Sequence, residues 1–337
     1  MLEIDGKEGG GQLLRTALSL SLCTGQAFRM EQIRAKRSRP GLMRQHLTAV
    51  QAAREVGDAL VSGAVPGSMT LQFTPRTVRG GEYRWSIGTA GSTTLVLQTI
   101  LPALWLAGVS ARLHLEGGTH NPLAPSADFL ADSFLPLMRR MGLNAQLSIE
   151  RHGFYPAGGG ALTMGIVEST APAPLHLAAR GELLEMSATA LMSSIPGRVG
   201  ERELDVIARR LPIAAEHRHI RQAIGSPGPG NTLMVRVQNA EIVELFTAFG
   251  ERGVSAERVA ELVSSEVSRY LESGAAVGPH LADQLLLPLA LAGGGSFSTQ
   301  TPTAHARSNA ALIEKFLPVE IEFEQKGSDQ WWVSVTR

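Results

Sequence analysis

Cysteine is almost absent from this chain: Cys23 is the only one among 337 residues. A single cysteine excludes an intramolecular disulfide and a zinc site built from cysteines. Long apolar runs are also missing, because the stretch from Leu95 to Gly108 is too short and too interrupted to span a bilayer. The N-terminal segment lacks the basic and apolar regions of a signal peptide. We therefore expect a cytoplasmic protein without membrane contact.

An excess of charge of either sign is missing as well, because 31 Lys and Arg residues balance 31 Asp and Glu residues. Any contact with nucleic acid must then come from a local basic patch rather than from the chain as a whole. The length is sufficient for two domains, and the 36 glycines predict many tight turns and close backbone approaches.

What the chain does have is an internal repeat. Three times, a glutamine opens an apolar helical run that a glycine ends, at Gln12–Gly25, Gln98–Gly108 and Gln284–Gly294. A short predicted strand and a second predicted helix follow each copy, which indicates an α/β architecture. The predicted strands are 27–33, 111–116 and 296–300, and the predicted second helices begin at Pro40, Pro125 and Ser308.

The copies are unevenly spaced. The second copy starts 86 residues after the first (12 to 98), and the third starts 186 residues after the second (98 to 284). Residues 180–273 fill the longer interval with their own predicted strands and helices. We interpret them as an inserted smaller domain, so that residues 1–179 and 274–337 form the large domain. A fourth, diverged copy of the repeat is the alternative.

Five cations lie within eleven residues, at Arg34, Lys36, Arg37, Arg39 and Arg44. A guanidinium group can bind a phosphate through two parallel N–H···O hydrogen bonds. In an otherwise neutral chain this cluster predicts a site for phosphates or an RNA end, although a solvated face without a partner would have the same composition. Pro40 predicts a helix start inside the cluster.

Several glycine-rich loops accompany this cluster, at residues 9–11, 88–94, 117–121 and 153–160. Each alone is explained as a tight turn, but together they predict loops that converge on a ligand. Glycines before a helix let backbone N–H groups approach a phosphate, and Glu8 beside the first loop could help to hold a divalent metal. A solvated carboxylate is the alternative for Glu8.

His305 precedes the last predicted helix, with Arg307 two residues further on. A neutral imidazole can act as a nucleophile toward phosphorus, and a neighbouring cation would help to hold a phosphate there. A surface or helix-capping histidine is the alternative.

The segments that carry these features resemble the RNA 3'-terminal phosphate cyclases, in the order of that family and over nearly the whole chain. The resemblance implies an α/β (α+β) fold of three βαβαββ units, as in enolpyruvyl transferases, with a smaller α/β domain inserted between the second and third units. The matching segments are 8–15, 34–46, 88–99, 117–125, 151–160, 280–285 and 303–309.

The resemblance also implies the reaction. His305 would attack the α-phosphorus of ATP to form histidine–AMP, AMP would pass to an RNA 3'-terminal phosphate, and the neighbouring 2'-hydroxyl would close a 2',3'-cyclic phosphate. The implied cofactors are ATP and a divalent metal, magnesium or manganese. The implied partner is RNA with a 3'-terminal phosphate, and a homodimer is expected because dimers are common among soluble proteins.

The family's functional residues fall on matching positions of this chain. Glu8 would lie near the metal, and Lys7 and His280 stand where the family usually has glycine and an aromatic residue. The ATP site would be lined by Gln98, Pro125, His280, Leu281, Ala282, Asp283 and Gln284, and the RNA end or phosphates would be held by Arg15, Arg34, Arg37, Gln45 and His46.

Two other functions share this pattern. Some relatives keep the fold without the nucleophilic histidine and serve in RNA binding or ribosome assembly, and an enolpyruvyl-transferase-like enzyme would need neither ATP nor such a histidine. A non-enzymatic interaction protein would leave the loops and cations unexplained. The histidine at 305 favours the enzyme.

Overall fold

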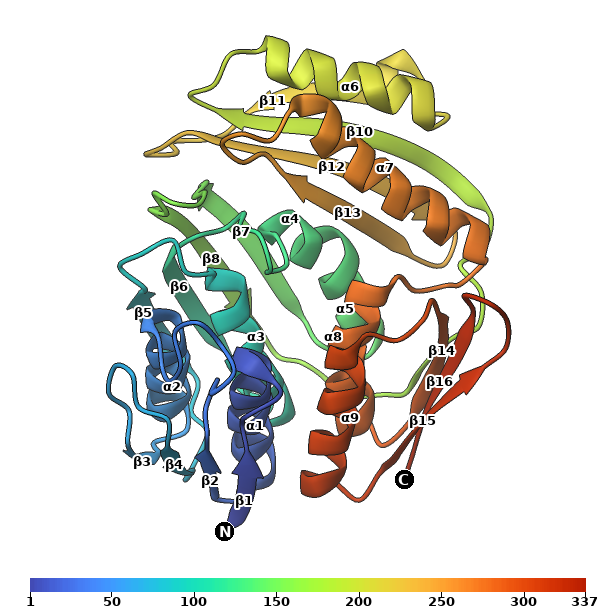
Figure 1. The fold of residues 1–337 in the computed structure, drawn as a ribbon. Helices are drawn as coiled ribbons and strands as arrows, with labels where there is room; N and C mark the ends of the chain where they lie inside the picture. Colours follow the sequence, from blue (N-terminus) through green and yellow to red (C-terminus); the bar gives the residue numbers. More distant parts are fainter.

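A computed structural model describes residues 1–337, and its three lower sheets repeat one unit (Figure 1). Each unit has four strands and places two helical segments on its sheet. The first unit comprises β1 (Leu2–Asp5), α1 (Gly10–Thr24), β2 (Phe28–Glu31), α2 (Arg44–Val56), β3 (Leu60–Ser62) and β4 (Leu71–Thr74). The second comprises β5 (Gly81–Ser86), α3 (Thr93–Leu106), β6 (Ala111–Gly117), α4 (Ala127–Phe129), the π-helix η1 (Leu130–Phe134), α5 (Leu135–Arg140), β7 (Ala145–Arg151) and β8 (Gly160–Ile166).

The third unit is interrupted after its first strand. It comprises β9 (Leu175–Leu177) and then, about 100 residues later by the spacing of the copies, α8 (Pro279–Leu291), β14 (Gly295–Thr299), α9 (Ala304–Phe316), β15 (Glu320–Gln325) and β16 (Trp331–Thr336). In all three units the sheet order is first, second, fourth and third strand, with the first two strands parallel and the other pairs antiparallel. The predicted α/β fold of three βαβαββ repeats is therefore confirmed. The repeated glutamines lie on α1, α3 and α8, but the prediction that they open these helices is wrong, because the helices begin at Gly10, Thr93 and Pro279.

The segment between β9 and α8 has a different topology. Its sheet order is β11-β10-β12-β13. Its third strand, β12, pairs with the first strand, β10, whereas the third strand of each repeat pairs only with the fourth. The alternative of a fourth repeat copy is therefore wrong. Its elements are β10 (Leu183–Ser193), α6 (Arg198–Arg210), the 3-10 helix η2 (Ala215–His217), β11 (Arg218–Gln222), β12 (Gly230–Asn239), β13 (Val243–Phe249) and α7 (Ala256–Ser273).

This inserted unit has a core of its own. Nineteen buried apolar residues pack between its sheet and the helices α6 and α7, which cover the outer face (Figure 1). A separate core of 69 residues runs through the three repeats and includes a few residues from the inner face of the insert, such as Leu191 and Met234. On this basis we propose residues 180–273 as a smaller domain and residues 1–179 and 274–337 as the large one.

The predicted start of the second helix is also wrong in each of the three units. Helix α2 begins at Arg44 instead of Pro40, because Arg34 and Gly41 have positive φ angles of 55° and 77° and fold the intervening residues into a loop. The second unit's helix begins at Ala127 instead of Pro125, after a Ser126 cap. Helix α9 begins at Ala304 instead of Ser308, because the Thr303 hydroxyl accepts the N–H of Ala306 as an N-cap.

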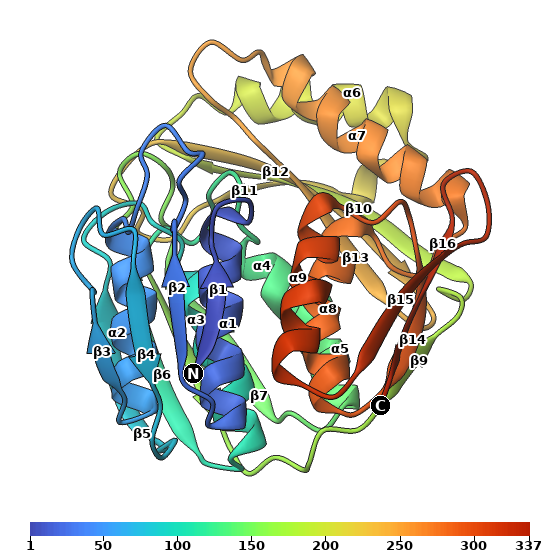
Figure 2. The ribbon, with the colours of Figure 1, turned by 60° about the horizontal axis from the view of Figure 1, so that its bottom comes forward.

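The helices of the three units meet in the middle of the large part. Helix α1 packs against both α3 and α9, and α8 packs against α9 (Figure 2). This arrangement brings the starts of α1 and α9, from opposite ends of the sequence, to one side of the molecule. None of the helices is long and apolar enough to cross a membrane.

Candidate active site

Two glycines at the start of α1 lie under three basic side chains, one from α1 itself and two from the segment 37–46. A Cβ atom at Gly10 would lie 3.0 Å from Nη2 of Arg37. A Cβ atom at Gly11 would lie 3.1 Å from Nη1 of Arg15 and would collide with Nε2 of His46. The absence of side chains at these two positions therefore lets Arg15, Arg37 and His46 crowd around the first turn of α1.

His305 faces the same group of cations. It is exposed on the first turn of α9, after the Thr303 cap. Desolvation lowers the pKa of His305, and the positive charges of Arg37 and Arg15 lower it further. The imidazole is therefore neutral at neutral pH, which is the form that has a lone pair for attack on an electrophile.

His46 is held as a neutral hydrogen-bond donor. Its Nδ1 accepts the N–H of Met43 at 3.1 Å, so the proton of the neutral ring lies on Nε2, the atom next to Gly11. Desolvation, followed by the charges of Arg15 and Arg34, lowers the pKa of His46 to about 3. A neutral N–H donor beside cations suits an anionic phosphate oxygen.

The basic loop between β2 and α2 is anchored by two of its own cations. The Arg34 guanidinium donates to the carbonyls of Arg39, at 2.8 Å, and Gly41, at 2.7 Å. Lys36 forms an ion pair with Glu8, and both side chains are exposed.

Arg15 of α1 is more enclosed: desolvation lowers its pKa to about 10, which still leaves it charged at neutral pH. Arg34 thus shapes the loop, while Arg37 lies next to Gly10 and its charge acts on His305.

Gln45 connects this site to a second set of predicted residues. Its Oε1 accepts the N–H of Ser92 at 2.8 Å, which leaves the amide N–H groups free to donate. The hydroxyl oxygens of Ser92 and Thr94 are 2.6 Å apart, and Thr94 donates to the carbonyl of Pro125 at 2.7 Å. A chain of hydrogen bonds therefore links a predicted RNA-end residue to a predicted ATP residue.

The remaining predicted ATP residues lie on α3 and α8. The amide of Gln98 donates to Oε1 of Gln284, whose own amide donates to the carbonyl of His280 at 3.2 Å. His280 is exposed, whereas the side chains of Leu281 and Ala282 are buried in the core. Only the backbone of those two residues could meet a nucleotide.

Asp283 joins α8 to the helix that carries His305. Burial raises the pKa of Asp283 to about 7, and the hydrogen bond from Thr303 opposes that rise. The Thr303 hydroxyl lies 2.7 and 2.9 Å from the two carboxylate oxygens. Because Thr303 is also the N-cap of α9, Asp283 fixes the first turn that presents His305.

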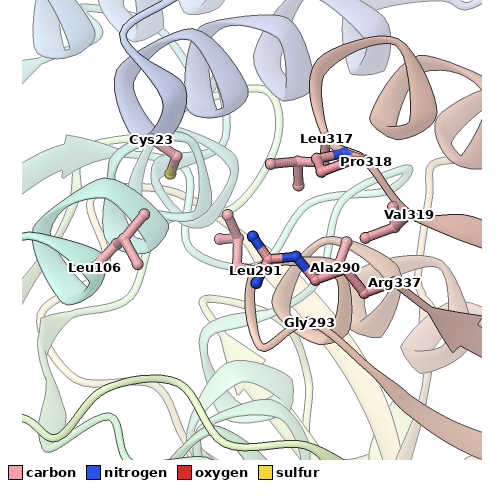
Figure 3. A pocket seen from close by; sticks show the side chains of 9 residues that line it. All are labelled: Cys23, Leu106, Ala290, Leu291, Gly293, Leu317, Pro318, Val319 and Arg337. Atoms are coloured by element: carbon pink, nitrogen blue, oxygen red, sulfur yellow. The ribbon is translucent and has the colours of Figure 1, made fainter.

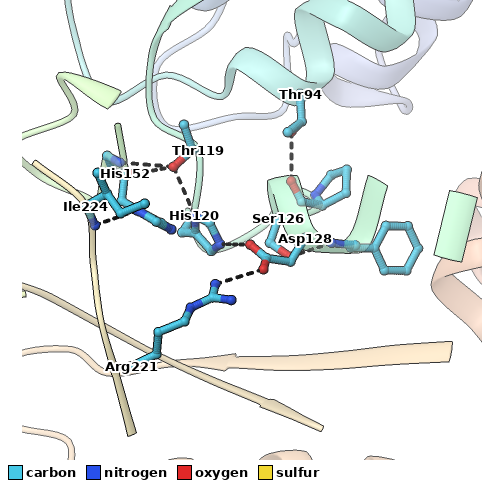
Figure 4. Close-up of polar contacts among 11 residues, drawn as sticks. Thr94, Thr119, His120, Ser126, Asp128, His152, Arg221 and Ile224 are labelled. Atoms are coloured by element: carbon cyan, nitrogen blue, oxygen red, sulfur yellow. Dashed lines mark hydrogen bonds and ion pairs between the residues drawn. The ribbon is translucent and has the colours of Figure 1, made fainter. Parts of the chain in front are cut away.

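A polar cluster that the sequence did not reveal lies between the second unit and the insert (Figure 4). Asp128 accepts from His120 Nε2 at 2.7 Å and from Arg221 of β11 at 3.0 Å. Burial alone would raise the pKa of Asp128, but the hydrogen bond and charge of His120 and the charge of Arg221 hold it well below its usual range. Arg221 is 93 residues away in sequence, so no local pattern indicated this contact.

His120, Asp128 and His152 approach one another closely enough to suggest a metal site. The ring of His152 argues against it. Its Nδ1 accepts the N–H of Ile224 at 2.9 Å, so the neutral ring carries its proton on Nε2 and has no free lone pair to offer. Burial is the main reason that the pKa of His152 is lowered to about 4. The cluster is therefore a connection between units.

The opposite ends of α1, α3 and α8 border an apolar pocket (Figure 3). Cys23, Leu106 and Leu291 contribute to it, and the Arg337 side chain lines it beside Leu291. Burial raises the pKa of Cys23 to about 12, so its thiol is unreactive at neutral pH. None of the predicted site residues lines this pocket.

Comparison with known proteins places the chain in a family. A family model described as RNA 3'-terminal phosphate cyclase matches residues 6–323. The protein of that name from Salmonella enteritidis PT4 is 51% identical over 326 residues, which cover 96% of each chain. Its namesake from Koribacter versatilis is 51% identical over 328 residues, which cover 97% of this chain and 92% of the relative.

Among solved structures, the enolpyruvyl transferase NikO from Streptomyces tendae aligns over 99% of this chain and 48% of its own, with 11% identity and a TM-score of 0.37. The EPSP synthase from Acinetobacter baumannii aligns over 99% and 64%, with 10% identity and a TM-score of 0.29. The family match and the relatives that are half identical over nearly their whole length are decisive: the chain belongs to the RNA 3'-terminal phosphate cyclase family.

Proposed function

We propose that this enzyme converts an RNA 3'-terminal phosphate into a 2',3'-cyclic phosphate at the expense of ATP, with His305 as the nucleophile. The observation that carries the proposal is the position of His305. It is an exposed, neutral imidazole at the start of a helix, and its pKa responds to Arg37 and Arg15. Family membership supplies the substrate class.

In the first step a ring nitrogen of His305 attacks the α-phosphorus of ATP. The new bond joins nitrogen to phosphorus, and the bond to the pyrophosphate oxygen breaks. Arg15 and Arg37 would offset the negative charge that gathers on the phosphoryl oxygens, and the N-terminus of α9 adds a favourable partial charge. Desolvation, helped by these two charges, also lowers the pKa of His305 and so favours the unprotonated ring before the attack.

In the second step an oxygen of the RNA 3'-phosphate attacks the adenylyl phosphorus and releases His305. In the third, the adjacent 2'-hydroxyl attacks the 3'-phosphorus, loses its proton, and expels AMP. A phosphate monoester resists such an attack until it is activated and its charge is offset. Arg34, Arg37, Gln45 and His46 would hold the 3'-phosphate, and DNA, which has no 2'-hydroxyl, could not complete the third step.

The ATP would lie beside Gln98, Pro125 and the segment 280–284, where Asp283 is tied to the cap of α9. Glu8 fits a magnesium or manganese ion that takes its other ligands from phosphates and water, because Glu8 is exposed and is held only by Lys36. Such a metal would help to neutralise the triphosphate. A homodimer and a cytoplasmic location stay predictions.

The catalytically silent relative is the main competing function. It would not require a neutral histidine among arginines, which is what the structure supports here. An enolpyruvyl-transferase-like activity would leave His305 without a role.

The test is incubation of the purified enzyme with α-labelled ATP and a divalent metal, followed by denaturing gel and acid treatment. We expect an acid-labile label that is discharged by RNA ending in a 3'-phosphate and is absent in His305→Ala. His219→Ala is the matched control, because His219 is exposed on the insert and should leave labelling unchanged. Absence of label on the wild type under varied metals would favour the silent relative.

A further inference from the structure

We infer that the inserted unit is a positioning element for the nucleotide, and that it holds two segments of the ATP site through Glu244 and Arg221. The inference rests on the proposed assignment of Pro125 and residues 280–284 to ATP. Neither Glu244 nor Arg221 is among the residues that the sequence pointed to. Both reach from the insert's sheet onto a helix start in the large part.

Helix α8 cannot cap its own N-terminus. Its N-cap is Gly278, which has no side chain, and Pro279 follows as the first helical residue. Helices α3, α7 and α9 differ, because Ser92, Ser255 and Thr303 cap them with their own hydroxyls. The first N–H groups of a helix have no partner inside it, so an acceptor for α8 must come from elsewhere.

Glu244 of β13 supplies that acceptor. Its Oε1 accepts the N–H of Gly278 at 2.5 Å, two residues before His280. A Cβ atom at Gly278 would lie 3.2 to 3.4 Å from the atoms of this carboxyl group, so the carboxyl group packs closely against the backbone there. Glu244 is almost fully buried, and burial raises its pKa to about 8. A neutral oxygen is therefore sufficient to accept the N–H of Gly278, and a glutamine at position 244 would also provide such an oxygen.

Arg221 of β11 holds the other segment. Its guanidinium donates to Asp128, which lies on α4 three residues after Pro125, and the same carboxylate is bonded to the buried His120. Pro125 is also fixed on its other side by Thr94. A shift of the insert would therefore change the position of the Pro125 segment through the partly buried carboxylate of Asp128.

The connections at the root of the insert restrict such shifts. The Ser298 hydroxyl of β14 donates to the carbonyl of Ala178 at 2.7 Å and accepts the N–H of Ala276 at 2.9 Å. It therefore ties the incoming and outgoing chain segments together. Arg180 donates to the carbonyls of Tyr270 and Leu271 at the end of α7. The insert is thus seated firmly enough to set where Glu244 and Arg221 point.

The experiment compares Glu244→Leu, Glu244→Gln and Arg221→Met with the wild type. The control is Arg202→Met, which breaks an exposed pair with Glu257 inside the insert. The readouts are the Kd of ATP by titration, the KM of ATP and kcat in His305 labelling, the KM of RNA in cyclisation, and the melting temperature.

We expect Glu244→Leu and Arg221→Met to weaken ATP binding about three- to tenfold, the usual effect of losing one hydrogen bond that positions a site. Glu244→Gln should stay within about twofold, because it keeps the acceptor. Arg202→Met and the KM of RNA should not change. An unchanged ATP affinity in Glu244→Leu and Arg221→Met would overturn the inference, whether or not the melting temperature falls.

If Glu244→Leu does not fold, Arg221→Met alone decides between the same two outcomes. Failure of the proposed function would look different. The wild type would then bind ATP without labelling of His305. The Kd of ATP in the variants, compared with that of the wild type, would still test the role of the insert.

Discussion

The same repeated helices have a polar, charged surrounding at one end and an apolar surrounding at the other. At the starts of α1 and α9, glycines, arginines and histidines crowd together, and the arginine charges add to desolvation in lowering the pKa values of His46 and His305. At the far ends of α1, α3 and α8, Cys23, Leu106 and Leu291 border an apolar pocket. The repeat thus supplies the scaffold three times, while the chemistry is confined to the end where helix starts favour anions.

The largest effect should come from adding one methyl group at the polar end. In Gly11→Ala the new Cβ would collide with His46 and press on Arg15. We expect the rate of His305 labelling to fall at least tenfold, because small displacements of catalytic groups are costly (about 100-fold per ångström). Labelling kinetics and melting curves check this; a normal rate would mean that these side chains move aside freely.

Arg37→Met should change how labelling depends on pH. The pKa of His305 is lowered first by desolvation and then by Arg37 and Arg15, so removing one charge moves it back toward its ordinary value. More of the ring is then protonated at pH 6, and protonated imidazole cannot attack. We expect the ratio of the rates at pH 6 and pH 8 to fall relative to wild type, by less than about twofold because desolvation and Arg15 still lower the pKa. An unchanged ratio, whatever the absolute rate, would contradict the assignment.

The same glycine-to-alanine change at the apolar end should affect stability only. Gly25 caps α1 with a φ of 72°, and nothing lies within 4 Å of a Cβ atom built there. Alanine should cost about 1 kcal/mol of unfolding free energy, or about 2 °C in melting temperature, because of the left-handed backbone. The labelling rate should stay normal; a loss would show that the two ends are coupled.

The smallest effect is expected at Cys23. Its raised pKa leaves almost no thiolate at pH 8, so iodoacetamide should modify the native protein far more slowly than the unfolded protein. Mass spectrometry measures the extent, and His305 labelling should survive. Rapid modification together with lost labelling would mean that the apolar pocket opens and communicates with the site.

Much of the fold was readable from the sequence because the repeat has local signals. Glutamine, apolar run and glycine recur on α1, α3 and α8, and the unequal spacing revealed the insert. The helix starts were less readable. Proline predicts helix starts at Pro40 and Pro125, whereas the hydroxyl of Ser126 and the backbone angles of Arg34 and Gly41 set those boundaries in the structure.

Site residues with a local sequence signal were predicted, and those that depend on distant contacts were not. The sequence pointed to the cations and His305, and the structure brings Arg15, Arg37, His46 and His305 together. Glu244, Asp128 and Arg221 were missed, because each acts through a partner that is distant in the chain. No periodicity links a carboxyl of β13 to the N–H of Gly278. The individual ATP and RNA assignments remain proposals.

The position of the insert also bears on how the chain folds. Strand β9 is only three residues long, and Leu175 pairs with Gly295 across the whole inserted unit. Forming this pairing carries an entropic cost for closing the long loop, and that cost is smaller once the intervening residues are compact. The insert, with its separate core, can fold first and shorten that loop. During synthesis, the third repeat, and with it the helix of His305, would then be the last part to close.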